Sequence, residues 1–208
     1  NVNVIRTSHY PPSPHLLDAC DELGMFVFEQ PPICFSGGFD DHHWTRTNEA
    51  AQLIPYLLEV TAETVHRDRG RCSVIVWDLG NESRWGLGFD AQLALVRQMD
   101  PGRPTTFSFD LNELGPENEL VHKPAAERPD IRSYHYPGWD RTWQEDLAWL
   151  GSYEQPVVLD EYAPLFAPCL RGPGEGFGLA IDPGIRDYWG AGYQPFMEPA
   201  LGDRSSAE

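Results

Sequence analysis

The chain has 208 residues, of which 41% are hydrophobic, so it can bury a sizeable core, and its composition excludes collagen, repeat arrays and disordered tails. Its 15 Lys and Arg residues against 32 Asp and Glu residues give a formal net charge of −17, which argues against nucleic acid and anionic membrane surfaces as partners. No apolar run approaches the roughly 20 residues that a membrane-spanning helix needs, so we expect no membrane partner.

The cysteines and histidines give no sign of a metal centre or a redox site. Cys20, Cys34, Cys72 and Cys169 lie far apart, with none of the C-x-x-C spacings that hold zinc or exchange thiols. The Asp-Asp-His-His run at 40–43 is flanked by glycines, and adjacent histidines point in different directions, so a solvated or substrate-facing loop is the preferred interpretation. The sequence therefore predicts no metal and no cofactor.

Strands and helices alternate along the chain. The expected elements are, in order, strand 2–8, helix 14–23, strand 25–29, a helix from 48 to about 70, strand 73–79, helix 89–99, strand 104–109, strand 130–136, helix 143–150, strand 157–162 and a weak helix over 185–197. Ser13 and Pro14 mark the start of the first helix and Gly24 its end, whereas Pro55 predicts a kink or a late start in the second. Segments 30–47 and 111–128 are expected to be loops.

Six strands that alternate with helical or loop crossovers predict parallel β/α units. Short strands with polar residues at their carboxyl ends favour a (β/α)8 TIM barrel over an open doubly wound sheet, and no Gly-rich phosphate-binding motif follows any strand. Because a closed barrel leaves no open edges, we expect the chain to hold about strands 2 to 7, with the first before Asn1 and the eighth after Glu208. We therefore expect residues 1–208 to form one incomplete barrel domain, a fragment of a longer multidomain protein.

Two of the expected strands end in a glutamate. The run Ser-Val-Ile-Val-Trp-Asp-Leu-Gly ends in Asn81 and Glu82, and the run Pro-Val-Val-Leu-Asp ends in Glu161. In a barrel these ends face one cavity, where a retaining glycoside hydrolase holds an acid and a nucleophilic carboxylate roughly 5 Å apart. Asn81, beside the acid, is suited to bind the sugar 2-hydroxyl. The sequence therefore predicts a retaining glycosidase with a carbohydrate substrate.

Residue type alone leaves other roles open. Since neighbouring strand residues face opposite ways, only one of Asp160 and Glu161 should point into the cavity, and either could be the nucleophile. Trp44, Trp85 and Trp139 are candidates for stacking on the apolar faces of sugar rings, although packing in the core accounts for them equally well.

Several short motifs occur in order along the chain. They are Arg6-Thr7-Ser8-His9-Tyr10-Pro11, Arg67-Asp68-Arg69 ahead of Ser73-Val74-Ile75-Val76-Trp77, Gly80-Asn81-Glu82-Ser83, and Asp160-Glu161-Tyr162-Ala163. Each is weak alone, but the ordered set resembles the catalytic barrel of glycoside hydrolase family 2, the β-galactosidase and β-glucuronidase family. The resemblance spans nearly the whole chain, and it implies a glycoside hydrolase barrel that cleaves a terminal β-linked sugar by double displacement.

The resemblance also implies which carboxylate has which role. By position in the motifs, Glu82 resembles the family's acid/base and Glu161 its nucleophile, so the resemblance selects Glu161 rather than Asp160. Asn81 resembles the family's partner of the 2-hydroxyl.

Other family positions match in part. Arg6 and His9 resemble residues that line the site near the nucleophile and the bound sugar, and Tyr136 resembles a tyrosine that hydrogen-bonds the nucleophile. Metal-carrying galactosidases of the family have Glu-Thr-His where residues 34–36 read Cys-Phe-Ser, so we expect no magnesium there. Pro164 replaces a histidine of the galactosidase pattern, which argues against galactose as the substrate.

Two other functions are compatible with the sequence. One is a carbohydrate-binding barrel without turnover, although binding alone would not require an acid opposite a nucleophile. The other is a retaining endo-glycanase of another barrel family, in which a strand-end Asn-Glu also supplies the acid. The full-length protein could be a homo-oligomer, and the sequence does not indicate a cellular compartment.

Overall fold

The computed structural model describes residues 2–34, 52–83, 85–108, 123–135, 148, 151 and 155–161. The chain divides into two compact units, Asn1–Asp160 and Glu161–Glu208. The described part lies in the first unit except for Glu161, the final residue of a strand that begins there. Within these ranges no helix is long and apolar enough to cross a lipid bilayer.

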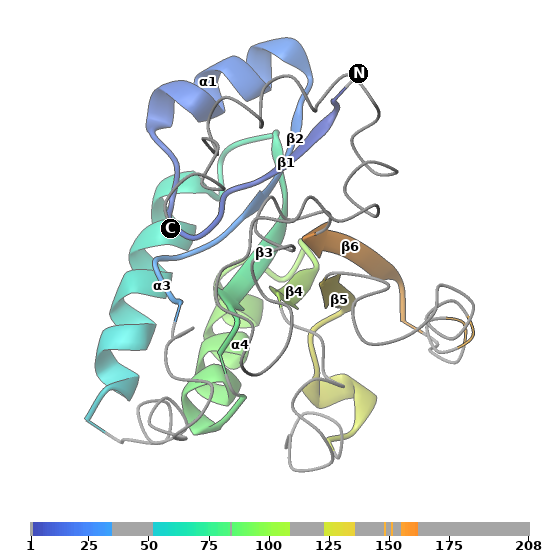
Figure 1. Cartoon of the computed structure of the whole chain (residues 1–208). Helices are drawn as coiled ribbons and strands as arrows, with labels where there is room; N and C mark the ends of the chain where they lie inside the picture. The colour runs from blue at the N-terminus through green and yellow to red at the C-terminus, as the bar shows by residue number, and fades with distance from the viewer. Residues whose placement is uncertain are drawn as a thin grey trace, which may run out of the picture. The chain divides into compact units, whose positions relative to one another are not determined.

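The strands and α-helices of the described residues follow one another in the order that the sequence predicts (Figure 1), but a 3-10 helix lies within the segment 111–128 that was expected to be a loop. They are β1 (Val4–Arg6), α1 (Pro14–Leu23), β2 (Phe26–Glu29), α3 (Ile54–Asp68), β3 (Val74–Asn81), α4 (Leu87–Met99), β4 (Thr105–Ser108), the 3-10 helix η2 (Ala125–Glu127), β5 (Ile131–His135) and β6 (Val157–Glu161). The strands form one six-stranded sheet in the order β1-β2-β3-β4-β5-β6, and the pairings from β1 to β5 are parallel.

A contact between the first and the last strand shows that the sheet is curved. Nε of Arg6 on β1 lies 3.6 Å from Oδ2 of Asp160 on β6. Neighbouring strands are about 4.8 Å apart, so a flat sheet of six would separate these strands by about 24 Å, beyond the reach of an arginine side chain. The sheet therefore curls back toward its first strand, which confirms the expected partial (β/α)8 TIM barrel.

Apolar side chains fill the space between the sheet and its helices. Leu17 of α1, Val27 of β2, Leu57 of α3 and Phe89 of α4 are all fully buried in this one core. Trp85 belongs to it as well, because its ring stacks on Phe89 with centroids 5.5 Å apart and it is 1% exposed. The alternative of core packing is thus correct for Trp85, which does not present its ring to a sugar.

The helix ends follow the local signals. Ser13 caps α1 by accepting a hydrogen bond from the backbone N–H of His15, and Gly24 ends it in the left-handed conformation with φ 69°. The second expected helix, α3, begins at Ile54 with Pro55 in its first turn, so the late start is confirmed.

The length of each strand differs from the predicted length by one to four residues. The carboxyl end of β3 lies two residues beyond the predicted one, at Asn81. β3 continues through Gly80, where the missing Cβ allows Ile33 and Phe89 to approach the backbone closely. The helix expected over 143–150, apart from residue 148, and the helix expected over 185–197 lie outside the described residues.

A buried pair of carboxyl groups joins β2 to α3. The side chains of Glu29 and Asp68 are both fully buried. Arg67 lies beside both, with Nη2 3.4 Å from Oε1 of Glu29 and Nε 2.6 Å from Oδ2 of Asp68. Burial and the neighbouring Asp68 raise the pKa of Glu29 to about 9, despite the opposing charge of Arg67, so Glu29 is protonated at neutral pH.

Candidate active site

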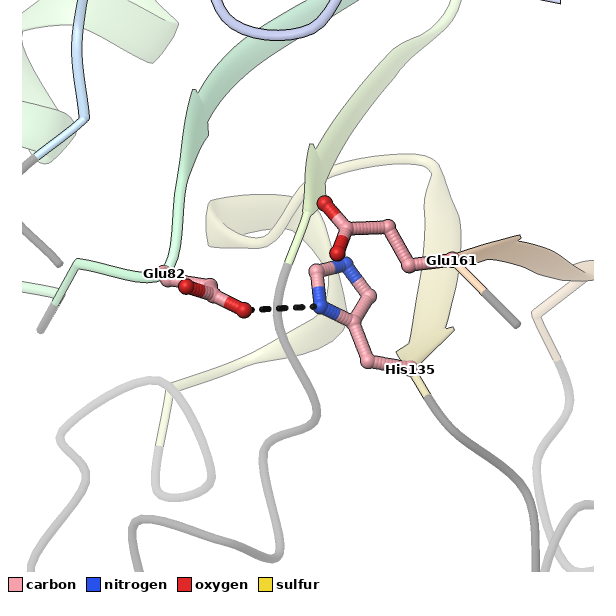
Figure 2. Close-up of side chains that lie close together, drawn as sticks. All are labelled: Glu82, His135 and Glu161. Atoms are coloured by element: carbon pink, nitrogen blue, oxygen red, sulfur yellow. Dashed lines mark ion pairs between the residues drawn. The ribbon is translucent and has the colours of Figure 1, made fainter. Parts of the chain in front are cut away.

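Three acidic or basic side chains meet where the parallel strands end. Glu82 follows the last residue of β3, His135 is the last residue of β5, and Glu161 is the last residue of β6. Figure 2 shows the three side chains turned toward one another. In barrel folds this carboxyl edge of the strands is where active sites form, so the local sequence places these groups at the edge suited to catalysis.

The three side chains lie within contact distance. Nδ1 of His135 is 3.7 Å from Oε1 of Glu82, and the nitrogen and carboxylate oxygens of Glu82, His135 and Glu161 all lie within 4.8 Å of one another (Figure 2). The His135 side chain is 1% exposed, whereas that of Glu82 is 20% exposed. A buried imidazole thus lies beside a carboxylate that is partly exposed to solvent.

The backbone of Glu82 is strained. Its φ of 39° lies in the left-handed region, which non-glycine residues rarely adopt. The conformation is held by a 3.0 Å hydrogen bond from the Glu82 N–H to the carbonyl of Ser108, at the end of β4. Strained backbone of this kind is concentrated at active sites, where the surrounding structure fixes one side-chain direction.

Arg6 links β1 to β3 and β6 through a buried ionic network. Its Nε donates a 2.8 Å hydrogen bond to Oδ2 of Asp78, and its Nη2 donates one of 2.6 Å to Oδ1 of Asn81. Asp160 lies 3.6 Å from the same Nε. The family resemblance implies a place for Arg6 near the nucleophile, and the structure puts it beside Asp160, which immediately precedes Glu161 in the sequence.

The two aspartates of this network are shifted in opposite directions. Burial raises the pKa of Asp78, and the neighbouring charge of Arg6 only partly offsets it. Burial alone would also raise the pKa of Asp160, but the hydrogen bond and charge of His135 hold it below its usual value. Asp160 also accepts a 2.6 Å hydrogen bond from Oγ of Ser133. Asp160 is therefore a well-supported carboxylate at neutral pH.

His9 reaches the network indirectly. Its Nδ1 lies 3.1 Å from Oε1 of Gln30, whose Nε2 donates a 3.1 Å hydrogen bond to Oδ2 of Asp78. The structure thus brings His9, Arg6 and Asn81 into one connected set of side chains, as expected for residues of one site. Two further predicted sugar-binding residues, Tyr136 and Trp139, lie outside the described residues.

Several members of the site do not stand out in the sequence. His135, Asp78 and Gln30 are all buried, and each contacts a predicted residue or its immediate partner. Polarity gives a retrospective signal for Asp78, which interrupts an apolar run in β3, but none for His135, because β5 reads Ile-Arg-Ser-Tyr-His. Asp160 and Glu161 were expected to face opposite ways, yet both come close to His135, because the alternation of a strand ceases at its last residue.

Glu82, His135 and Glu161 also form a donor set that could hold a metal ion, although the sequence predicts no metal. The set offers one imidazole nitrogen and two carboxylate oxygens, which suits zinc or a similar transition metal. It supplies three ligands, one fewer than a closed structural zinc site requires.

Comparison with known proteins identifies relatives of the chain. Residues 1–174 match the family described as glycosyl hydrolases family 2, TIM barrel domain. The chain is 28% identical over 199 residues to a β-galactosidase of Kluyveromyces lactis, covering 84% of this chain and 18% of that protein. It is 30% identical over 164 residues to a β-galactosidase of Alteromonas mediterranea, covering 78% of this chain and 15% of that protein. The chain thus spans less than a fifth of these relatives.

Solved structures give a matching result. The β-D-glucuronidase of Dictyoglomus thermophilum superposes with a TM-score of 0.61 at 26% identity, over 77% of this chain and 30% of that one. A Ruminococcus gnavus β-glucuronidase superposes with a TM-score of 0.53 at 28% identity, over 66% of this chain and 24% of that one. Both superpositions agree with the barrel topology described above.

Proposed function

Because the chain belongs to glycosyl hydrolase family 2 and carries its TIM barrel domain, we propose that the protein hydrolyses a terminal β-linked sugar by double displacement. The similarity to proteins named β-galactosidase and β-glucuronidase supports a glycosidase. In this proposal Glu82 is the acid/base and Glu161 is the nucleophile.

One observation carries the proposal, the closeness of two carboxylates at the ends of β3 and β6. Carboxylate oxygens of Glu82 and Glu161 lie within 4.8 Å of each other. Retaining glycosidases hold their two carboxyl groups about 5 to 5.5 Å apart, whereas inverting enzymes need about 6.5 to 9.5 Å to admit a water molecule. The short separation supports direct attack on the sugar and net retention.

The first step would break the glycosidic bond. The carboxyl group of Glu82 gives its proton to the departing glycosidic oxygen while a carboxylate oxygen of Glu161 attacks the anomeric carbon. The products are a free alcohol and a glycosyl ester on Glu161, and Glu82 is left as a carboxylate.

The second step would return the enzyme to its starting state. The carboxylate of Glu82 takes a proton from water, whose oxygen attacks the anomeric carbon and displaces Glu161. The sugar leaves with its original anomeric configuration, Glu82 is again protonated, and Glu161 is again ionised.

Asn81 would bind the sugar beside the acid/base. Its Oδ1 accepts a hydrogen bond from Arg6, and its Nδ2 donates one of 3.7 Å to Sγ of Cys34, so the second N–H of the amide is the one offered to a 2-hydroxyl. We also propose that His9, Tyr136 and Trp139 contribute to the sugar-binding site. The relatives' names point to galactose or glucuronic acid, and Pro164, in place of the galactosidase histidine, argues against galactose.

A mechanism-based label tests the proposal. The full-length protein is incubated with 2-fluoro-glycosides of galacto, gluco, manno and glucurono configuration, which trap the covalent intermediate, and the labelled peptide is mapped by mass spectrometry. We expect one configuration to label Glu161. Label on Asp160 would reassign the nucleophile, and bound sugar without label would favour the carbohydrate-binding barrel.

A further inference from the structure

His135 lies between two carboxylates. Nε2 of its ring is 3.2 Å from Oδ1 of Asp160, and Nδ1 is 3.7 Å from Oε1 of Glu82. The His135 and Asp160 side chains are 1% and 2% exposed, so this part of the contact is removed from water. Neither the proposed chemistry nor the family motifs assign a role to His135.

Asp160 orients the ring of His135. As a carboxylate, Asp160 can only accept a hydrogen bond, so Nε2 is the nitrogen that carries the proton. Ser133 and Arg6 hold Asp160 in turn, the first through a 2.6 Å hydrogen bond and the second at 3.6 Å. We therefore expect the ring orientation and the tautomer to be set by Asp160, which is buried and contacts two further side chains.

The opposite edge of the ring faces the acid/base. Nδ1 of the ring points toward Oε1 of Glu82, so the ring borders the space in which the Glu82 carboxyl group can turn. A distance of 3.7 Å is longer than a hydrogen bond, and such contacts commonly shorten when substrate binds.

Glu82 needs support from a neighbouring side chain. It lies beyond the end of β3, its backbone has a φ of 39°, and its side chain is 20% exposed. An unsupported glutamate in this place would sample several rotamers, of which one would reach the glycosidic oxygen.

We infer that His135 is a positioning residue for Glu82, held in place by the Asp160 carboxylate and acting on the direction in which Glu82 delivers its proton. The inference rests on the proposed function, because it assumes that Glu82 is the acid/base. It concerns orientation and requires no additional chemical step.

The test compares substrates that differ in their need for a proton. His135→Gln keeps an amide that can reach Asp160, and His135→Asn keeps one that can occupy the place of Nδ1 near Glu82. For both variants we expect kcat/KM to fall about 10- to 100-fold on alkyl glycosides, whose leaving groups need protonation, and by about threefold or less on 2,4-dinitrophenyl glycosides, whose leaving group does not. Equal losses on both substrates, or no loss on either, would overturn the inference.

Glu82→Ala in the same assays separates this inference from the proposed function. If Glu82→Ala shows the same leaving-group dependence and azide restores its turnover, Glu82 is the acid/base and the outcome for His135 decides the inference alone. If Glu82→Ala lacks that dependence, the proposed function fails with it.

A measurement on the unaltered protein does not depend on how the variants fold. NMR of protein labelled with ¹⁵N in its histidines reports which ring nitrogen carries the proton. The His135 signal is the one that is absent from the His135→Gln spectrum, or the one whose ring proton is buried and exchanges slowly. We expect the proton on Nε2. A proton on Nδ1 in the neutral ring would contradict orientation by Asp160 and overturn the inference.

Discussion

Nη2 of Arg6 donates a 2.6 Å hydrogen bond to Oδ1 of Asn81, although 75 positions separate the two residues in the sequence. The bond decides which end of the Asn81 amide faces a ligand, because the oxygen is engaged by the guanidinium. The same guanidinium also donates to Asp78, so the amide is tied to the buried network of the barrel.

Replacement of Arg6 by Lys should impair recognition of the sugar 2-hydroxyl. A single ammonium group cannot reproduce the two donors that contact Asp78 and Asn81, and the loss of a charge-assisted hydrogen bond is expected to lower kcat/KM about 10-fold or more. The loss should be smaller on the matching 2-deoxy-glycoside. If both substrates lose equally, Arg6 does not act through Asn81.

Replacement of Glu82 by Gly should relieve backbone strain while abolishing activity on alkyl glycosides. Glycine adopts a φ of 39° without steric cost, whereas alanine pays about 1 kcal/mol, so Glu82→Gly should unfold at higher denaturant than Glu82→Ala. Chemical denaturation of the two variants measures the difference. Identical midpoints would show that the left-handed conformation costs nothing there.

Replacement of Gly80 by Ala should displace the end of β3. The added Cβ would lie 3.1 Å from Cε1 of Phe89 and 3.3 Å from the carbonyl oxygen of Ile33, and the backbone atom cannot move aside cheaply. We expect a loss of about 1 to 3 kcal/mol of stability, together with reduced kcat because Asn81 and Glu82 follow directly. Gly70→Ala, where no heavy atom lies within 4 Å of the new Cβ, is the matched control and should change neither property.

The protonation of Glu29 should make stability depend on pH. Its pKa is raised to about 9, above the unfolded value, so the folded state binds more protons than the unfolded state between roughly pH 4.5 and 9. Stability should therefore be greatest below that window and fall as pH rises through it, by at most about 1.4 kcal/mol per pH unit from this group. Urea unfolding at several pH values measures the slope.

Glu29→Gln supplies the control for that slope. The amide stays neutral and can still donate to Asp68, so the variant should lose the part of the slope that Glu29 contributes and gain stability at pH 8 relative to the wild type. A variant with an unchanged slope would mean that Glu29 is already ionised in the folded protein.

The sequence predicted features that local patterns determine. Ser13 and Gly24 bound α1 because capping depends on a few adjacent residues, and Glu82 and Glu161 were placed together because parallel strands end at one edge. The roles of Arg6 and His9 came from the family resemblance.

Contacts between distant residues could not be predicted. His135 contacts Asp160 and Glu82 because β5 lies between β4 and β6 in the sheet and because the three residues are at or next to the ends of their strands. No local sequence pattern encodes this arrangement. The burial of Glu29 was also hidden, since its partner Asp68 lies on α3, far from Glu29 in the sequence.

Each strand of the sheet lies next to the strand that the ribosome makes immediately before it. The sheet can therefore grow from its amino-terminal edge during synthesis, with every new strand finding a finished neighbour. The contact between Arg6 and Asp160 is different, because it joins the first strand to the sixth and has to wait until β6 has been made. Arg6 and Asp78 lie on strands that are made earlier, so this pair can form first and gains Asp160 as its neighbour only when β6 has joined the sheet.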